Sequence, residues 1–193
     1  MNIRIKTDLE AEPLTLAVMS QFLKYEDNQT AENTLISSMI SSVRTILEQR
    51  TGLVFASKTF EVHFDPSDYP FVIPVYPIIS VDSMVAIDYQ GTETDLTLNT
   101  DYYKTGMYEI DLIINSLLNY NPETLDDDKY HDRYKVTVKA GFGHDDTETL
   151  PVALLNAMQS QVFQWYQNRD DFHEGNVLGL IDKAVMLFKR EFI

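Results

Sequence analysis

Apolar residues recur at three- and four-residue spacing in the first 52 residues, which predicts two helices. Thr15 can cap the first helix, and Leu14 can pack on Met19 inside it. The second helix begins near Thr30 and ends at residues 50–52, where Gly52 provides a stop. The apolar positions are Val18, Met19, Phe22 and Leu23 in the first helix, and Leu35, Ile36, Met39, Ile40, Val43, Ile46 and Leu47 in the second.

Helical spacing returns at the C-terminal end of the sequence. Pro151 suits the first turn of a helix, and a shorter amphipathic helix follows after Gly175. The apolar positions are Leu154, Leu155, Met158, Val162, Trp165 and Tyr166 in the longer helix, and Leu180, Ile181, Ala184, Val185 and Phe188 in the shorter one.

Between these regions the period changes to two, which is typical of strands. Phe60, Val62 and Phe64 alternate with polar residues in the first strand. Further strands are predicted at residues 81–89, 96–98, 108–114 and 134–140, and residues 72–75 are an edge strand or an extended connection because of Pro74. The predicted fold class is α+β. An N-terminal helical pair (1–52) and C-terminal helices (150–193) form a small bundle, and the middle segment (53–149) is a β-rich insertion.

Composition and charge narrow the class of protein. The 193 residues include 44% hydrophobic and 23% charged residues, as expected for one globular domain, with or without a subdomain. The formal charge is −15, and residues 53–149 hold 18 acidic and only 6 basic residues. Such a charge opposes general electrostatic binding of nucleic acid. The lack of an apolar start or a long apolar run leads us to expect a soluble intracellular protein without membrane contact.

Candidate catalytic or metal-binding groups are sparse. The absence of cysteine excludes disulfides, thiolate nucleophiles and cysteine-ligated metals. Histidines 63, 131, 144 and 173 are scattered, and Asp126, Asp127 and Asp128 do not follow the spacing of a calcium loop. Gly141 and Gly143 precede acidic residues, which would repel phosphate. We therefore expect neither an enzyme nor a bound cofactor or metal.

Five stretches in order resemble one family of structural proteins. They are residues 14–17, the long helix 32–52 with its Thr-Gly end, the Pro-x-x-Ser-Val strand entry at 77–85, the Ala-Gly-Phe-Gly strand end at 136–143, and Leu150-Pro151 followed by Trp165, Tyr166 and Arg169. Together they resemble the head–tail connector (adaptor) proteins of tailed bacteriophages, the gp6-like family of the HK97 type.

The resemblance implies a non-enzymatic structural role at the head–tail junction of a virion assembled in the bacterial host cytoplasm. Copies of the protein would form a twelvefold ring that docks on the portal protein, extends the DNA channel and presents a surface to the next head-completion or tail protein. It also implies that the C-terminal segment contacts the portal or a neighbouring subunit. The candidate contact residues are Leu180, Ile181, Val185 and Phe188.

Two hypotheses accompany this reading. Acidic residues of the middle segment, Asp126, Asp127 and Asp128 among them, would line the channel so that DNA passes without specific binding. Residues 175–193 would be mobile in the single chain and order on docking to the portal.

The alternatives to a head–tail connector are another virion ring module, such as a tail-completion or tail-terminator protein, a small hydrolase or metal enzyme, and an acidic DNA mimic.

Overall fold

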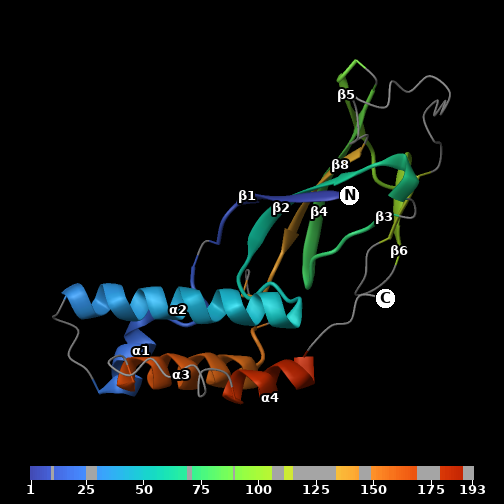
Figure 1. The fold of residues 1–193 in the computed structure, drawn as a ribbon. Helices are drawn as coiled ribbons and strands as arrows, with labels where there is room; N and C mark the ends of the chain where they lie inside the picture. The colour runs from blue at the N-terminus through green and yellow to red at the C-terminus, as the bar shows by residue number, and fades with distance from the viewer. Residues whose placement is uncertain are drawn as a thin grey trace. The chain divides into compact units, whose positions relative to one another are not determined.

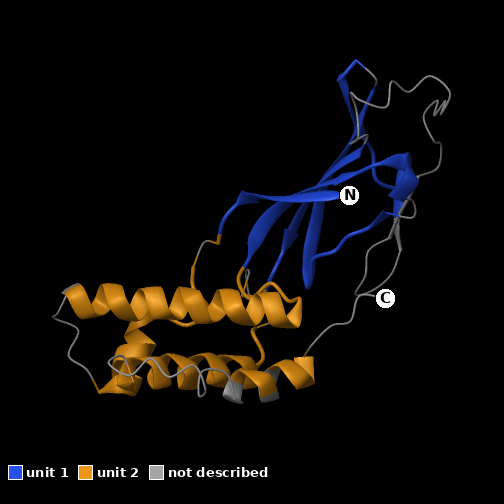
Figure 2. Ribbon diagram, in the orientation of Figure 1, with its two compact units in different colours: residues 1–8, 57–141 blue, residues 9–56, 142–193 orange. Residues whose placement is uncertain are grey.

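The chain forms two compact units, each built from separate parts of the sequence. The computed structural model describes residues 1–9, 11–24, 30–68, 71–88, 90–105, 111–114, 134–143, 149–168 and 179–188. Residues 1–8 and 57–141 form a β unit, and residues 9–56 and 142–193 form a helical unit (Figure 2). The fold is therefore α+β, as predicted, with the N-terminal helices and the C-terminal helices in one bundle.

The helical unit contains α1 (Leu16–Leu23), α2 (Thr30–Thr51), α3 (Val152–Gln167) and α4 (Gly179–Phe188). α2 packs against the other three helices, and α3 also contacts α1 and α4 (Figure 1). The predicted cap is present, because the Thr15 hydroxyl accepts a hydrogen bond from Val18 N at 3.3 Å. The buried core contains Leu14, Met19, Ile36, Ile40, Val43, Leu47, Leu154, Met158, Val162 and Ile181.

An arginine side chain, that of Arg44, is buried in the helical unit. The Arg44 side chain is 7% exposed, and its Nε and Nη1 lie 2.8 Å from carboxylate oxygens of Glu12 and Glu48. Glu48 also accepts a hydrogen bond from Phe55 N at 2.9 Å. Burial alone would lower the pKa of Arg44, but hydrogen bonds and charge attraction from the two glutamates outweigh it and raise the pKa. Arg44, Glu12 and Glu48 therefore connect three parts of the chain. These are the segment before α1, the helix α2, and the segment that follows α2.

The substitution Arg44→Met should lower the free energy of unfolding by roughly 2–4 kcal/mol, because it leaves two carboxylates without their cation in a largely buried site. The matched control is Arg50→Met, on the same helix. Its ion pair with Asp182 is 36% and 59% exposed, so its loss should cost less than about 1 kcal/mol. Chemical denaturation followed by helical circular dichroism measures both. Equal losses would contradict the special role of Arg44.

The β unit contains two antiparallel sheets. The larger has the order β1-β2-β8-β4-β5, with β1 (Asn2–Thr7), β2 (Lys58–Phe64), β8 (Tyr134–Ala140), β4 (Ile78–Ile87) and β5 (Glu93–Leu96). The smaller has the order β3-β7-β6, with β3 (Phe71–Val72), β7 (Asp111–Ile114) and β6 (Tyr102–Thr105). A short 3₁₀ helix, η1 (Pro66–Asp68), precedes β3.

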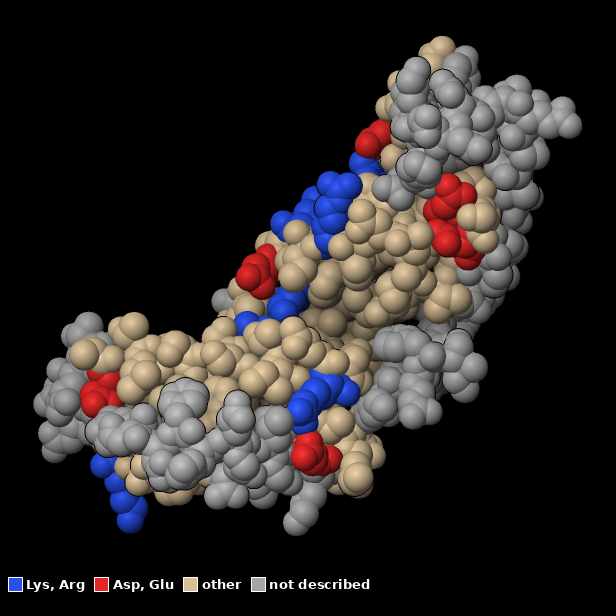
Figure 3. Space-filling view, in the orientation of Figure 1, with Lys and Arg blue, Asp and Glu red and all other residues tan. Residues whose placement is uncertain are grey.

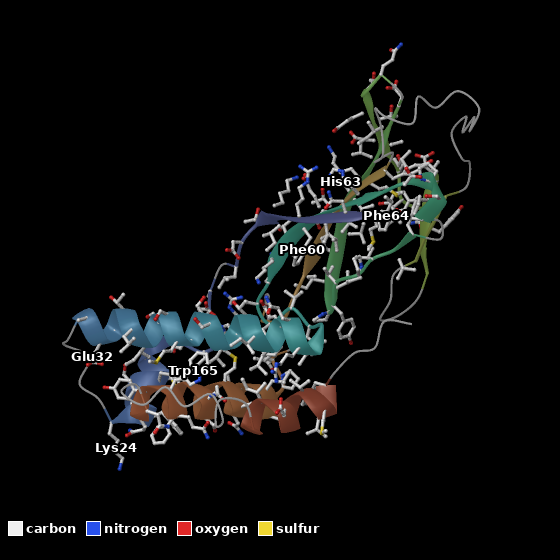
Figure 4. All side chains as sticks on the ribbon, in the orientation of Figure 1. Lys24, Glu32, Phe60, His63, Phe64 and Trp165 are labelled. Atoms are coloured by element: carbon white, nitrogen blue, oxygen red, sulfur yellow. The ribbon has the colours of Figure 1, made fainter. Side chains whose placement is uncertain are left out.

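One face of the larger sheet forms the core of the β unit. The alternating residues Phe60, Val62 and Phe64 lie on this face, as the period of two predicted. Figure 4 labels Phe60 and Phe64, together with His63, which alternates with them along β2 and belongs to the other face of the sheet. Phe71 of β3 lies between Phe64 and Tyr134, with ring centroids 4.9 and 5.0 Å away, and so connects the two sheets.

Two strands were not predicted, and one of them changes the division of the chain. β6 lies between the strands predicted at residues 96–98 and 108–114. β1 lies in residues 1–8, which the helical spacing of residues 1–52 assigns to the helical pair. Ile3 and Ile5 alternate with Arg4 and Lys6, so the signal for a strand was present but spans only four residues. The pairing with β2 brings this segment into the β unit.

The turn between β4 and β5 is organised by Asp88. Its Oδ1 accepts hydrogen bonds from Thr92 N and Gln90 N, both at 2.8 Å, and Gly91 adopts a positive φ of 82°. Hydrogen bonds from the backbone of Thr92, and then of Gln90, favour the charged carboxylate and lower its pKa. These hydrogen bonds close the turn that joins β4 to β5.

NMR titration of the Asp88 carboxyl should give a midpoint below its ordinary value of 3.8. Because the folded pKa is lowered, the contribution of Asp88 to the hairpin is complete above its unfolded pKa and is lost as pH falls through the folded pKa. In Asp88→Ala the amides of Gln90 and Thr92 should exchange hydrogen faster, while amides of β8 keep their protection. An unshifted midpoint would contradict this description of the turn.

Candidate interaction surfaces

The predicted contact residues of the C-terminal segment differ sharply in exposure. Ile181 is 0% exposed and belongs to the core of the helical unit, and Val185 and Phe188 are half-buried. The side chain of Leu180 lies outside the described residues. The most exposed apolar side chains of α4 are instead Met186 and Leu187, at 85% and 75%. The amphipathic pattern identified the inward face of α4, whereas these two consecutive residues were not singled out.

α4 packs on α2 and α3 within a single chain, and Asp182 forms an ion pair with Arg50 of α2. This differs from the expectation that residues 175–193 order only on docking, at least for residues 179–188. The reason is the apolar face that carries Ile181, which finds its partner inside the helical unit.

A second apolar surface lies on α1 and α3, and we call it the α1–α3 surface. It contains the exposed residues Val18, Phe22 and Phe163, and the rings of Phe22 and Phe163 meet edge to face with centroids 5.7 Å apart. Val18 and Phe22 belong to the apolar stripe predicted for α1, but only Met19 on that helix is a fully buried apolar residue. The short helix α1 therefore buries one side of its stripe and leaves the other open.

Charged residues gather on one face of the larger sheet. Arg4 and Lys6 come from β1, and Glu93 and Asp95 come from β5 at the other edge. Figure 3 shows blue and red groups interspersed along the β unit, some of them in contact. Ion pairs within the sheet join Lys6 to Glu61 at 3.3 Å and Lys135 to Glu93. Arg4 and Asp95 are exposed and form no ion pair with any other described residue.

The other predicted site residues are only partly covered by the structure. Asp126, Asp127 and Asp128 lie outside the described residues, as do His131, His144 and His173. His63 is buried in β2. Among the described residues, no group of acidic or histidine side chains could hold a metal ion. In the same part of the chain, no helix is long and apolar enough to cross a membrane.

Comparison with known proteins identifies the fold. No family model and no curated protein matches the sequence. Among solved structures, a chain of the native gene transfer agent virion has a TM-score of 0.75 and 19% identity, covering 100% of this chain and 97% of that chain. A chain from the neck of the empty gene transfer agent particle, computed with C6 symmetry, has a TM-score of 0.75 and 18% identity over the same shares. A chain from the neck of the native particle, computed with C12 symmetry, has a TM-score of 0.70 and 19% identity. Both units described above therefore have counterparts in these chains.

Substitution of a buried and of an exposed residue of α4 should have effects on stability of very different size. Ile181→Ser should cost roughly 3–5 kcal/mol, because it removes core volume and buries a hydroxyl. Leu187→Ser, on the same helix, should change the free energy of unfolding by less than about 0.5 kcal/mol. Thermal or urea unfolding measures both variants. A strongly destabilised Leu187→Ser would show that this side chain is structural and not part of an open surface.

Proposed function

We propose that this protein is a structural ring component of the neck of a phage-like particle. In this role it docks on the portal protein, extends the DNA channel and provides the attachment surface for the next tail-side protein. The observation that carries the proposal is the length of the fold match. The likeness extends over the whole of this chain and 97% of chains that belong to the gene transfer agent virion and neck.

The surfaces of the protein support an assembly role. A closed ring requires two different complementary surfaces on each copy, and docking requires a further one. The helical unit exposes Met186 and Leu187 on α4, together with the α1–α3 surface. Exposed apolar groups of this kind are typical of protein contacts. We assign α4 to the contact with the portal protein or with a neighbouring copy, with Met186 and Leu187 as its exposed anchors.

The twelvefold symmetry and the passage of DNA are further parts of this proposal. C12 symmetry was applied to the neck of the native gene transfer agent particle, which supports twelve copies for the ring proposed here. The acidic excess of residues 53–149 supports a channel wall that repels phosphate, and Asp126, Asp127 and Asp128 are the candidates for that wall.

Electron microscopy of the purified protein mixed with the portal protein of the same genome tests the proposal. We expect a second ring stacked on one end of the portal ring, with one copy of this chain per portal subunit. The double variant Met186→Ser/Leu187→Ser should remain folded and lose stacking or ring formation, because its apolar anchors are gone.

The matched control is Val152→Ser, which alters an apolar residue of the same unit that is 70% exposed. It should leave stacking unchanged. Portal rings that never acquire this protein, together with no ring of the protein alone, would overturn the proposed function.

A further inference from the structure

The larger sheet has two open edges within the described part of the chain. The strand order begins at β1 and ends at β5, and neither strand pairs with a described strand on its outer side. All six residues of β1 are exposed, as are three of the four residues of β5. An open edge presents backbone N–H and C=O groups to any strand that lies beside it. The question is which strand fits each edge.

The two edges carry opposite charge. β1 contains Arg4 and Lys6 and has no carboxylate within Asn2–Thr7. β5 contains Glu93 and Asp95, and residues 88–101 around it include Asp88 and Asp101 but no lysine or arginine. The basic edge fits the acidic edge, and neither fits itself.

The charged side chains also lie on the same face of the sheet. Arg4 is aligned with Glu61, which is aligned with Thr137 on β8. From the other edge, Asp95 is aligned with Val85, which is aligned with Lys135 on β8. Since Lys135 and Thr137 are two residues apart on one strand, all these side chains point to one face. By the same register, Ile5 and Thr94 share the opposite face.

The direction of the strands favours a head-to-tail arrangement. Each of the four neighbouring pairs in the sheet is antiparallel, so β1 and β5 run in the same direction. Placing β1 of one copy beside β5 of the next gives a parallel pair and can be repeated through every copy. A two-fold pair of β1 with β1 would instead bring Arg4 and Lys6 against the same residues, and a pair of β5 with β5 would oppose carboxylates.

We propose that β1 of one copy pairs with β5 of the next copy, so that the larger sheets join edge to edge around the ring. This inference rests on the proposed function, since it specifies the contact that closes the ring. Arg4 of one copy and Asp95 of the next face each other on one side of the junction. Ile3 and Ile5, which are 40% and 55% exposed in the single chain, lose water on the other side.

The cysteine-free sequence allows a clean cross-linking test. The exposed residues Ile5 and Thr94 are changed to cysteine, singly and together, and assembled protein is oxidised and run on a denaturing gel. Ile5→Cys/Thr94→Cys should give a ladder of covalent oligomers up to a full ring. A mixture of the two single variants should give dimers and nothing larger, because each chain then offers one thiol. Ile3→Cys with Thr94→Cys covers a register shifted by two residues.

Charge exchange provides the second test. Arg4→Asp alone and Asp95→Arg alone should each weaken the contact by about tenfold or more, since each opposes like charges at the junction. The double variant Arg4→Asp/Asp95→Arg should recover ring formation, because every junction then has the pair in reverse. The matched control is Asp82→Arg, an exposed residue of the interior strand β4, which should assemble as the unaltered protein does.

The outcomes separate this inference from the proposed function. Rings that form normally while both double-cysteine variants stay uncross-linked overturn the β1–β5 contact and leave the neck role intact. Cross-linking of either single variant with itself shows a two-fold contact and also overturns it. Failure of the unaltered protein to form a ring, alone or on the portal, sinks the proposed function itself.

Discussion

The helical unit depends on one buried cation. Arg44 lies inside the bundle and holds Glu12 from the segment before α1 and Glu48 from its own helix, while Glu48 also fixes the backbone of Phe55. Apolar packing would accept several rotations of α2, because its stripe contains seven large residues. A buried guanidinium accepts only the arrangement in which both carboxylates reach it. The hydrogen bonds of Arg44 and Glu48 therefore connect three parts of the chain: the segment before α1, α2 itself and the segment that follows α2.

Prediction from the sequence succeeded where one period extends over many residues. The long helix α2 and the strand β8 were found because their apolar spacing holds over the full element and Gly52 and Gly141 follow them. β1 was missed because four alternating residues at an exposed edge carry little burial signal. The inward face of α4 was identified, but its role depends on neighbours that are distant in sequence. The periodicity predicts that Ile181 is buried, but only the fold shows that α4 packs against α2 and α3.

The two units offer contacts of different physical kinds. The exposed residues of α4 and of the α1–α3 surface are apolar, whereas the β unit combines edges of opposite charge with exposed apolar residues such as Ile3 and Ile5. Salt acts on these in opposite directions, since it screens exposed charges and, for strongly hydrated anions such as sulfate, strengthens apolar association. The two kinds of contact therefore respond differently to salt in any assembly that uses both.

The division of the chain has a mechanical consequence. The polypeptide passes from one unit to the other three times, after residues 8, 56 and 141. A protease that cuts any one of these passages leaves the units joined by the other two. A pulling force between the units is likewise shared by three covalent connections of the chain, where a single linker would carry it alone. Such threading gives tensile redundancy in a chain that has no disulfide to supply it.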